Sequence, residues 1–147
     1  MRDAGNDLIH NEGQAEKMKY RIIIPGEPKT KKNSQRILKN HRTGKSFVAP
    51  SMDFVRYENQ CLWILRQCEG RPADPIGYPV NLKCIYYMPT RRRVDLVNLL
   101  EATCDILVAA GILEDDNSDI VVSHDGSRVV KGAKGQEHVE IWIEQMQ

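Results

Sequence analysis

One apolar, helix-like segment, residues 95–110, carries acidic side chains along one side and is followed by an acidic turn. A step of 100° per residue puts four polar side chains on the side opposite its leucine stripe: Asp95 at the edge, Asn98, Glu101 and Asp105. Asp115 and Asp116 follow, just past Gly111. Magnesium prefers carboxylate oxygens, so the pattern predicts a divalent metal site if the acidic turn folds back beside Asp95. The alternative is a solvated helix face followed by an ordinary turn.

Basic side chains stand next to the first acidic group and in one earlier segment. The segment from Pro28 to Met52 has seven Lys or Arg and no Asp or Glu, although the net charge of the chain is only +1. We expect contacts with nucleic acid from Lys29, Lys31, Lys32, Arg36, Arg91, Arg92, Arg93 and Asn98. For the three arginines, a solvated run that softens repulsion among the acids is the competing interpretation. A steep loss of binding with salt would support phosphate contacts.

A chain of 147 residues fits one domain. Residues 1–18 are polar and aperiodic, and we expect them to form a flexible extension to a domain over residues 19–147. The expected class is α/β in the broad sense (α+β), a small single domain with a mixed sheet flanked by two helices. The expected order is β-α-β-α-β-β, with strands over 20–24, 80–88, 120–130 and 138–143 and helices over 51–70 and 95–110. Between the first strand and the first helix we expect a long basic loop.

Several functional classes have no support in the sequence. The four cysteines are widely spaced and form no CxxC pair, so we expect reduced core residues rather than a zinc site or disulfides. No apolar run approaches the roughly 20 residues that span a bilayer, and there is no GxxxxGK[ST] phosphate loop. We therefore expect a cytoplasmic protein without a membrane span and without a nucleotide cofactor.

The segment from Met88 to Ile120 resembles the RusA family of Holliday junction resolvases, which are small and often prophage-encoded endodeoxyribonucleases. The resemblance lies in Met88-Pro-Thr-Arg-Arg-Arg-Val-Asp-Leu-Val-Asn-Leu, Asp105-Ile-Leu, Ala109-Ala-Gly111 and Glu114-Asp-Asp116, with Pro25-Gly-Glu-Pro28 and Lys31-Lys-Asn33 similar to the family's N-terminal loop. It implies a homodimer that cuts branched DNA, the four-way junction, with Mg²⁺ or with Mn²⁺ in its place. It also implies that Asp95 and Asp116 are catalytic carboxylates, and that Asp115 beside them is a further metal ligand.

Two positions depart from the family's pattern. Val97 stands where members usually have a second aspartate, and Glu101 stands where they usually have a lysine. Our hypothesis is that Glu101 replaces the lost carboxylate as a third catalytic residue, with Asp125 as a possible helper. One alternative is a diverged member that binds branched DNA without cutting it. A domain that binds small molecules or proteins instead would leave the acid-free basic segment unexplained.

Overall fold

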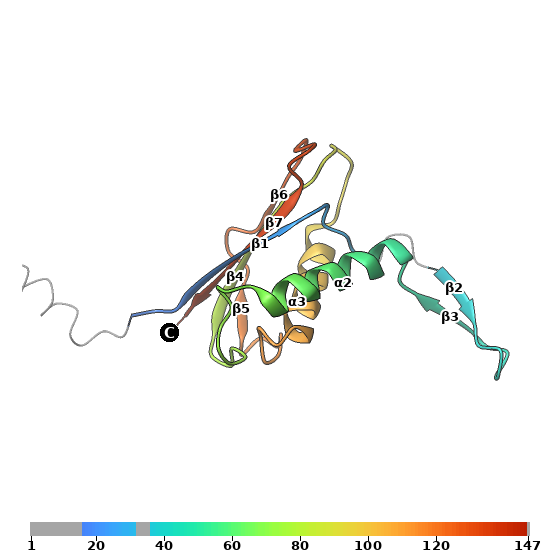
Figure 1. Ribbon diagram of the computed structural model, residues 1–147, viewed down its shortest axis with the longest axis horizontal. Coiled ribbons are helices and arrows are strands. Elements are labelled where there is room, and N and C mark those ends of the chain that lie inside the picture. Colours follow the sequence, from blue (N-terminus) through green and yellow to red (C-terminus); the bar gives the residue numbers. More distant parts are fainter. Residues whose placement is uncertain (1–15, 32–35, 147) are drawn as a thin grey trace, which may run out of the picture.

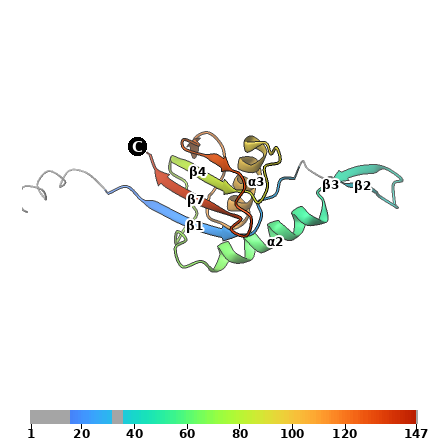
Figure 2. The same ribbon diagram turned by 90° about the horizontal axis from the view of Figure 1, so that it is seen from above.

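The structure is a computed structural model that describes residues 16–31 and 36–146. Its elements follow in the order β1 (Lys19–Pro25), β2 (Arg36–Lys39), β3 (Ser46–Ala49), α2 (Met52–Gln67), β4 (Val80–Tyr87), α3 (Leu96–Ala109), β5 (Val121–Ser123), β6 (Arg128–Val130) and β7 (His138–Gln145). One sheet and the two helices form the main body. The β2–β3 hairpin projects from it beyond the N-terminal end of α2 (Figures 1 and 2).

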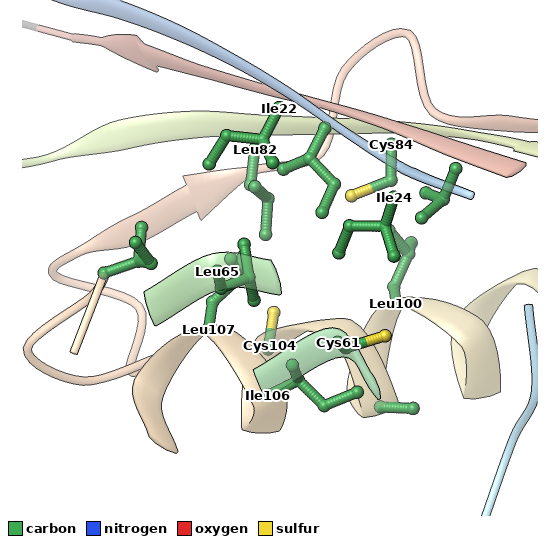
Figure 3. Close-up of a cluster of buried hydrophobic side chains, with 14 of the residues drawn as sticks. Ile22, Ile24, Cys61, Leu65, Leu82, Cys84, Leu100, Cys104, Ile106 and Leu107 are labelled. Atoms are coloured by element: carbon green, nitrogen blue, oxygen red, sulfur yellow. The ribbon is translucent and has the colours of Figure 1, made fainter. Parts of the chain in front are cut away.

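The sheet has the order β1-β7-β4-β5, and β6 also pairs with β4. Strand β7 is antiparallel to both β1 and β4, whereas β5 and β6 are parallel to β4. The predicted mixed sheet is therefore confirmed. Alternate residues of β7 are buried, and Ile141 lies opposite Ile22 of β1 and Cys84 of β4. All three belong to the buried core, and Ile22 and Cys84 point toward α2 and α3, which cover the same face of the sheet (Figure 3).

Both helices begin at the residues that the sequence predicts. The Ser51 hydroxyl accepts a hydrogen bond from the Phe54 amide at 3.1 Å and caps α2. Helix α3 starts after Asp95 and ends before Gly111, whose positive φ of 75° favours glycine. A buried hydrogen bond of 2.7 Å between the hydroxyls of Tyr86 and Thr103 fixes α3 to β4.

The C-terminal ends of the two helices meet at Arg71. Its guanidinium donates to the carbonyl of Leu65 in the last turn of α2 at 2.9 Å, and to the carbonyl of Ala110 at the end of α3 at 3.0 Å. A cation at this place offsets the negative ends of both helix dipoles. The helices thus share one anchored end, and their first turns lie toward the opposite end of the domain.

Two stretches differ from the sequence-based expectation. The predicted long basic loop contains the β2–β3 hairpin, closed by a turn in which Asn40 accepts from the Arg42 amide and Gly44 has a φ of 72°. The predicted single strand over 120–130 is two short strands, because Gly126, with a φ of 87°, turns the chain between β5 and β6. All four cysteines are free thiols, and three of them are buried as expected.

Candidate functional site

Asp95 lies at the entrance of α3 and has a structural task there. Its Oδ1 accepts a hydrogen bond from the Val97 amide at 2.9 Å, the geometry of a helix N-cap. The side chain is exposed, as is Glu101 two turns along the same helix, and Asn98 between them is half-buried. Val97 is 68% exposed, so its side chain occupies the surface beside Asp95 and takes no part in the core.

Lys31 reaches across to this polar side of α3. Its Nζ lies 2.9 Å from Oδ2 of Asp105. This hydrogen bond raises the pKa of Lys31, and the negative charges of Asp105, Glu58 and Glu101 raise it further against the opposing effect of burial. Lys31 and Glu101 also line a small recess with Asn98. Lys31, which we predicted to contact phosphate, is thus paired with Asp105 of α3 when no DNA is bound.

The acidic turn after α3 is held by its own hydrogen bonds. The two oxygens of Asp115 accept from the Asp116 amide at 2.7 Å and from the Asn117 side chain at 3.0 Å. These bonds lower the pKa of Asp115. Asp116 is exposed. Asp115 therefore orders the turn, and both carboxylates of the pair are exposed.

The turn lies beside the second half of α3. Burial raises the pKa of the Cys104 thiol to about 12, and the nearby negative charges of Asp116 and Asp105 contribute to the rise. Cys104 follows Asp95 by nine residues, which is about 13 Å along a helix axis. The sheet explains this placement, since β5 pairs with β4 at Val80, the start of β4, whereas Asp95 follows the end of β4. The acidic turn is thus brought beside Cys104, in the second half of α3.

Asp125 lies away from this region. Its amide donates to the side chain of Asn81, and the amide group of Asn81 donates to its carbonyl. Together with Lys83 and Trp142 these residues line a hollow on the face of the sheet opposite the helices. The suggestion that Asp125 assists Glu101 is therefore wrong, because the sheet separates the two side chains.

The residues fit a magnesium site of the open kind. Within residues 16–31 and 36–146, no three His, Cys, Asp or Glu side chains converge so as to hold a metal ion. Magnesium usually binds through one or two carboxylates, with waters and substrate phosphates completing its shell. The carboxylates of α3 and of the acidic turn provide such oxygens, whereas a closed structural site would need more ligands.

Three exposed arginines precede the cap. Arg91, Arg92 and Arg93 lie in the connection between β4 and α3, and none of them forms an ion pair with another described residue. Arg92 and Arg93 line a pocket of about 210 Å³ that also includes Lys29 and Thr30. Cationic groups without a protein partner are available for an anionic ligand.

The other predicted contacts with nucleic acid are dispersed. Lys29 lies 3.4 Å from Glu27, and Arg36 donates to the carbonyl of Pro50 at the base of the hairpin at 2.9 Å. Lys32 falls outside the described residues. Thr30 lines this pocket and its hydroxyl is buried, but the sequence does not single it out, because a threonine in a basic loop has no pattern that marks it.

Comparison with known proteins places the chain in a family. The sequence pattern of the family described as "Endodeoxyribonuclease RusA" matches residues 25–144. The chain is 30% identical over 92 residues to the "Crossover junction endodeoxyribonuclease RusA" of Aquifex aeolicus (strain VF5), an alignment that covers 63% of this chain and 69% of that protein. In the part of the chain that the structure describes, neither helix is long and apolar enough to span a bilayer. On the extent of these matches, the chain belongs to the RusA family of endodeoxyribonucleases.

Proposed function

We propose that this protein is a structure-selective endodeoxyribonuclease that resolves four-way DNA junctions with Mg²⁺, or with Mn²⁺ in its place. The observation that carries the proposal is the combination of exposed carboxylates along α3 and the acidic turn with arginines at the entrance of the same helix that form no ion pair with a described residue. The relative in Aquifex aeolicus is named for cutting crossover junctions. Polarised charge of this kind suits the cleavage of a phosphodiester, since cations hold the substrate while carboxylates hold the ion.

In this proposal Asp95 at the helix entrance, and Asp115 and Asp116 in the acidic turn, provide oxygen ligands for magnesium at two places along α3, with waters and DNA phosphates completing each shell. Glu101 stands in for the aspartate that Val97 replaces. The bound ion would activate water and neutralise charge on the phosphate that is cut. The other side chains of the site position the phosphates of the DNA. Arg91, Arg92 and Arg93 hold the backbone next to the carboxylates, and the basic loop with Asn98 extends the contact.

Lys31 gives this arrangement a cation of its own. The resemblance to the family leads one to expect a lysine at position 101, where this chain has a glutamate. The Lys31 ammonium lies against the same polar side of α3, at 2.9 Å from Asp105 and near Glu101. We infer that the loop lysine supplies the positive charge that the helix lacks. In this proposal the helix has gained a carboxylate at position 101, and the loop lysine provides the cation near the scissile phosphate.

The decisive experiment is a cleavage assay on a synthetic four-way junction with labelled strands. We expect paired nicks in Mg²⁺ or Mn²⁺ and none in EDTA, and we expect Asp116→Asn and Glu101→Gln each to lose cleavage while still binding the junction. Symmetrical nicking also requires two active sites, so we expect a homodimer by analytical ultracentrifugation. A wild-type protein that binds junctions but never nicks them would instead support a non-catalytic branched-DNA-binding protein, the alternative that Val97 favours.

A further inference from the structure

We propose that the pocket between the basic loop, the first turn of α2 and the Arg92–Val94 segment is a binding site for one phosphate group. In DNA the occupant would be a backbone phosphodiester next to the one that is cut, and this part of the proposal rests on the proposed function. The binding of a phosphate oxyanion in the pocket does not rest on it.

The pocket is built from three separate parts of the chain. It has a volume of about 210 Å³ and is lined by Lys29 and Thr30 of the loop, Ser51 at the start of α2, and Arg92 and Arg93 before α3. Ligand sites commonly arise where elements meet in this way. The pocket lies immediately before the cap of α3, because Arg93 precedes Asp95 by two residues.

Thr30 provides the feature that points to a ligand. Its residue is only 4% exposed, and its Oγ1 is buried without a hydrogen-bond partner among the described residues. Thr103 is buried to a similar degree, at 6% exposure, yet its hydroxyl is paired with Tyr86 at 2.7 Å and with the Leu99 carbonyl at 2.9 Å. Native proteins seldom leave such a group unpaired. Thr30 is one of the residues that line the pocket, and rotation of its side chain about χ1 would present the hydroxyl to an occupant.

The charges around the pocket indicate an anionic occupant. The guanidiniums of Arg92 and Arg93 have no carboxylate partner within residues 16–31 and 36–146. The lining also includes two acids, and each is already paired: Glu27 with Lys29 at 3.4 Å, and Asp53 with Arg56 at 3.2 Å. The two arginines are therefore left to bind an external anion, and guanidinium suits the geometry of phosphate.

The start of α2 adds backbone donors. Ser51 caps the Phe54 amide, while the amides of Met52 and Asp53, as the first two residues of the helix, have no acceptor within it. The positive end of a helix dipole favours negative charge and is a recurrent place for phosphate. A hydroxyl, two guanidiniums and a helix N-terminus thus converge on one small volume. This set can satisfy several oxygens of a single phosphate group.

The test uses the full-length protein and the variants Thr30→Val and Thr30→Ser. Binding of a fluorescent four-way junction is measured by anisotropy in EDTA, where no cleavage occurs. Valine keeps the shape and removes the hydroxyl, so we expect about tenfold weaker binding, whereas serine keeps the hydroxyl and should stay within about twofold of wild type. Thr103→Val is the matched control: it removes a paired hydroxyl in the core, and we expect it to lower stability without weakening the binding of DNA.

Stability gives a second readout of the same variants. If no ligand is bound, removing an unpaired buried hydroxyl should leave the urea midpoint of Thr30→Val unchanged or higher. A lower midpoint would mean that Thr30 is needed for packing, and junction binding equal to wild type would overturn the proposal. The expected result for Thr30→Val is weaker binding of the junction with no loss in the urea midpoint.

Titration with inorganic phosphate separates this proposal from the proposed function. We expect the amide NMR signals of Thr30 and Met52 to shift with phosphate in the wild type and not in Thr30→Val. This result would stand even if the protein never cuts a junction or does not bind DNA. Signals that do not respond to phosphate in the wild type would overturn the pocket while leaving junction cleavage open to its own assay.

Discussion

Asp95 has two tasks in the proposed mechanism, and a pair of substitutions separates them. Its carboxylate caps α3 through the bond to the Val97 amide, and it is also a proposed ligand of the metal ion. Asn can accept the same hydrogen bond but is a much weaker ligand, whereas Ala can do neither. Asp95→Asn and Asp95→Ala should therefore differ in stability and agree in catalysis.

The expected size of the difference follows from the exposed position of the cap. Losing an N-cap side chain costs about 1 kcal/mol, and losing only the charge at a helix N-terminus costs about 0.3–1 kcal/mol. Asp95→Ala loses both, which is about 1.5 kcal/mol, and Asp95→Asn loses only the second. For a domain of this size we expect midpoints of thermal unfolding lower by about 4 °C for Ala and about 2 °C for Asn.

Cleavage of the labelled junction in Mg²⁺ should fall by about a hundredfold or more in both variants, because a lost ligand removes charge stabilisation worth several kcal/mol. Thermal unfolding is followed by circular dichroism, and binding in EDTA is the control for an intact DNA surface. Normal cleavage by Asp95→Asn would show that Asp95 is only a cap. Equal stability of Asp95→Ala and wild type would refute the capping geometry.

Four further changes test other parts of the structure. Val97→Asp should leave stability unchanged or slightly higher, because Val97 is 68% exposed in the first turn of α3. If a carboxylate is missing there, the substitution should raise junction cleavage by about tenfold or more. Unchanged cleavage would mean that Glu101 already fulfils that role. Lys31→Met should change the free energy of unfolding by about 0.5 kcal/mol or less at pH 7, since both partners of its ion pair are 39% exposed. Because the pKa of Lys31 is raised, the contribution of the pair is complete below its ordinary pKa and is lost only as pH rises through the raised value, so a pH dependence of the Lys31→Met effect between pH 6 and 8 would contradict the pairing. Tyr86→Phe should cost about 1 kcal/mol or more in urea unfolding, because it leaves the Thr103 hydroxyl with one partner fewer in the core; no loss would argue against that bond. A disulfide reagent at pH 8 should quickly modify one thiol of the native protein, that of Cys68. The other three thiols are buried, and burial raises the pKa of Cys61 to about 11 and that of Cys84 and Cys104 to about 12. Rapid reaction of several thiols would show an open core.

Much of the fold can be predicted because its signals are local. The cap at Ser51 and the spacing of Phe54, Tyr57, Cys61 and Leu65 fix α2, and Gly111 marks the end of α3. The alternation in β4 and β7 is equally direct. The hairpin was missed because its strands have only four residues each and carry basic side chains that resemble a loop. The division of β5 from β6 depends on one glycine turn within an otherwise apolar run.

The site is less predictable, because it depends on contacts between distant segments. The sequence indicates that Asp95 begins a helix and that Asp116 lies in a turn after it, but not that the next strand pairs with β4. It does not tell how far along α3 the turn comes to rest, which depends on the pairing of β5 with the start of β4. Nor does it indicate that Lys31 lies 2.9 Å from Asp105, since 74 residues separate the two.

The β2–β3 hairpin is an appendage on which the folding of the rest of the domain should not depend. Within the described chain its strands pair only with each other, and Ile37, Phe47 and Val48 are 78%, 49% and 61% exposed. A ribbon of this size is marginally stable in water, so the domain should tolerate its excision, with residues 36–49 replaced by a short flexible linker. The arm could then be exchanged between related enzymes as a cassette, and differences in substrate reach between such chimeras would be attributable to the arm alone.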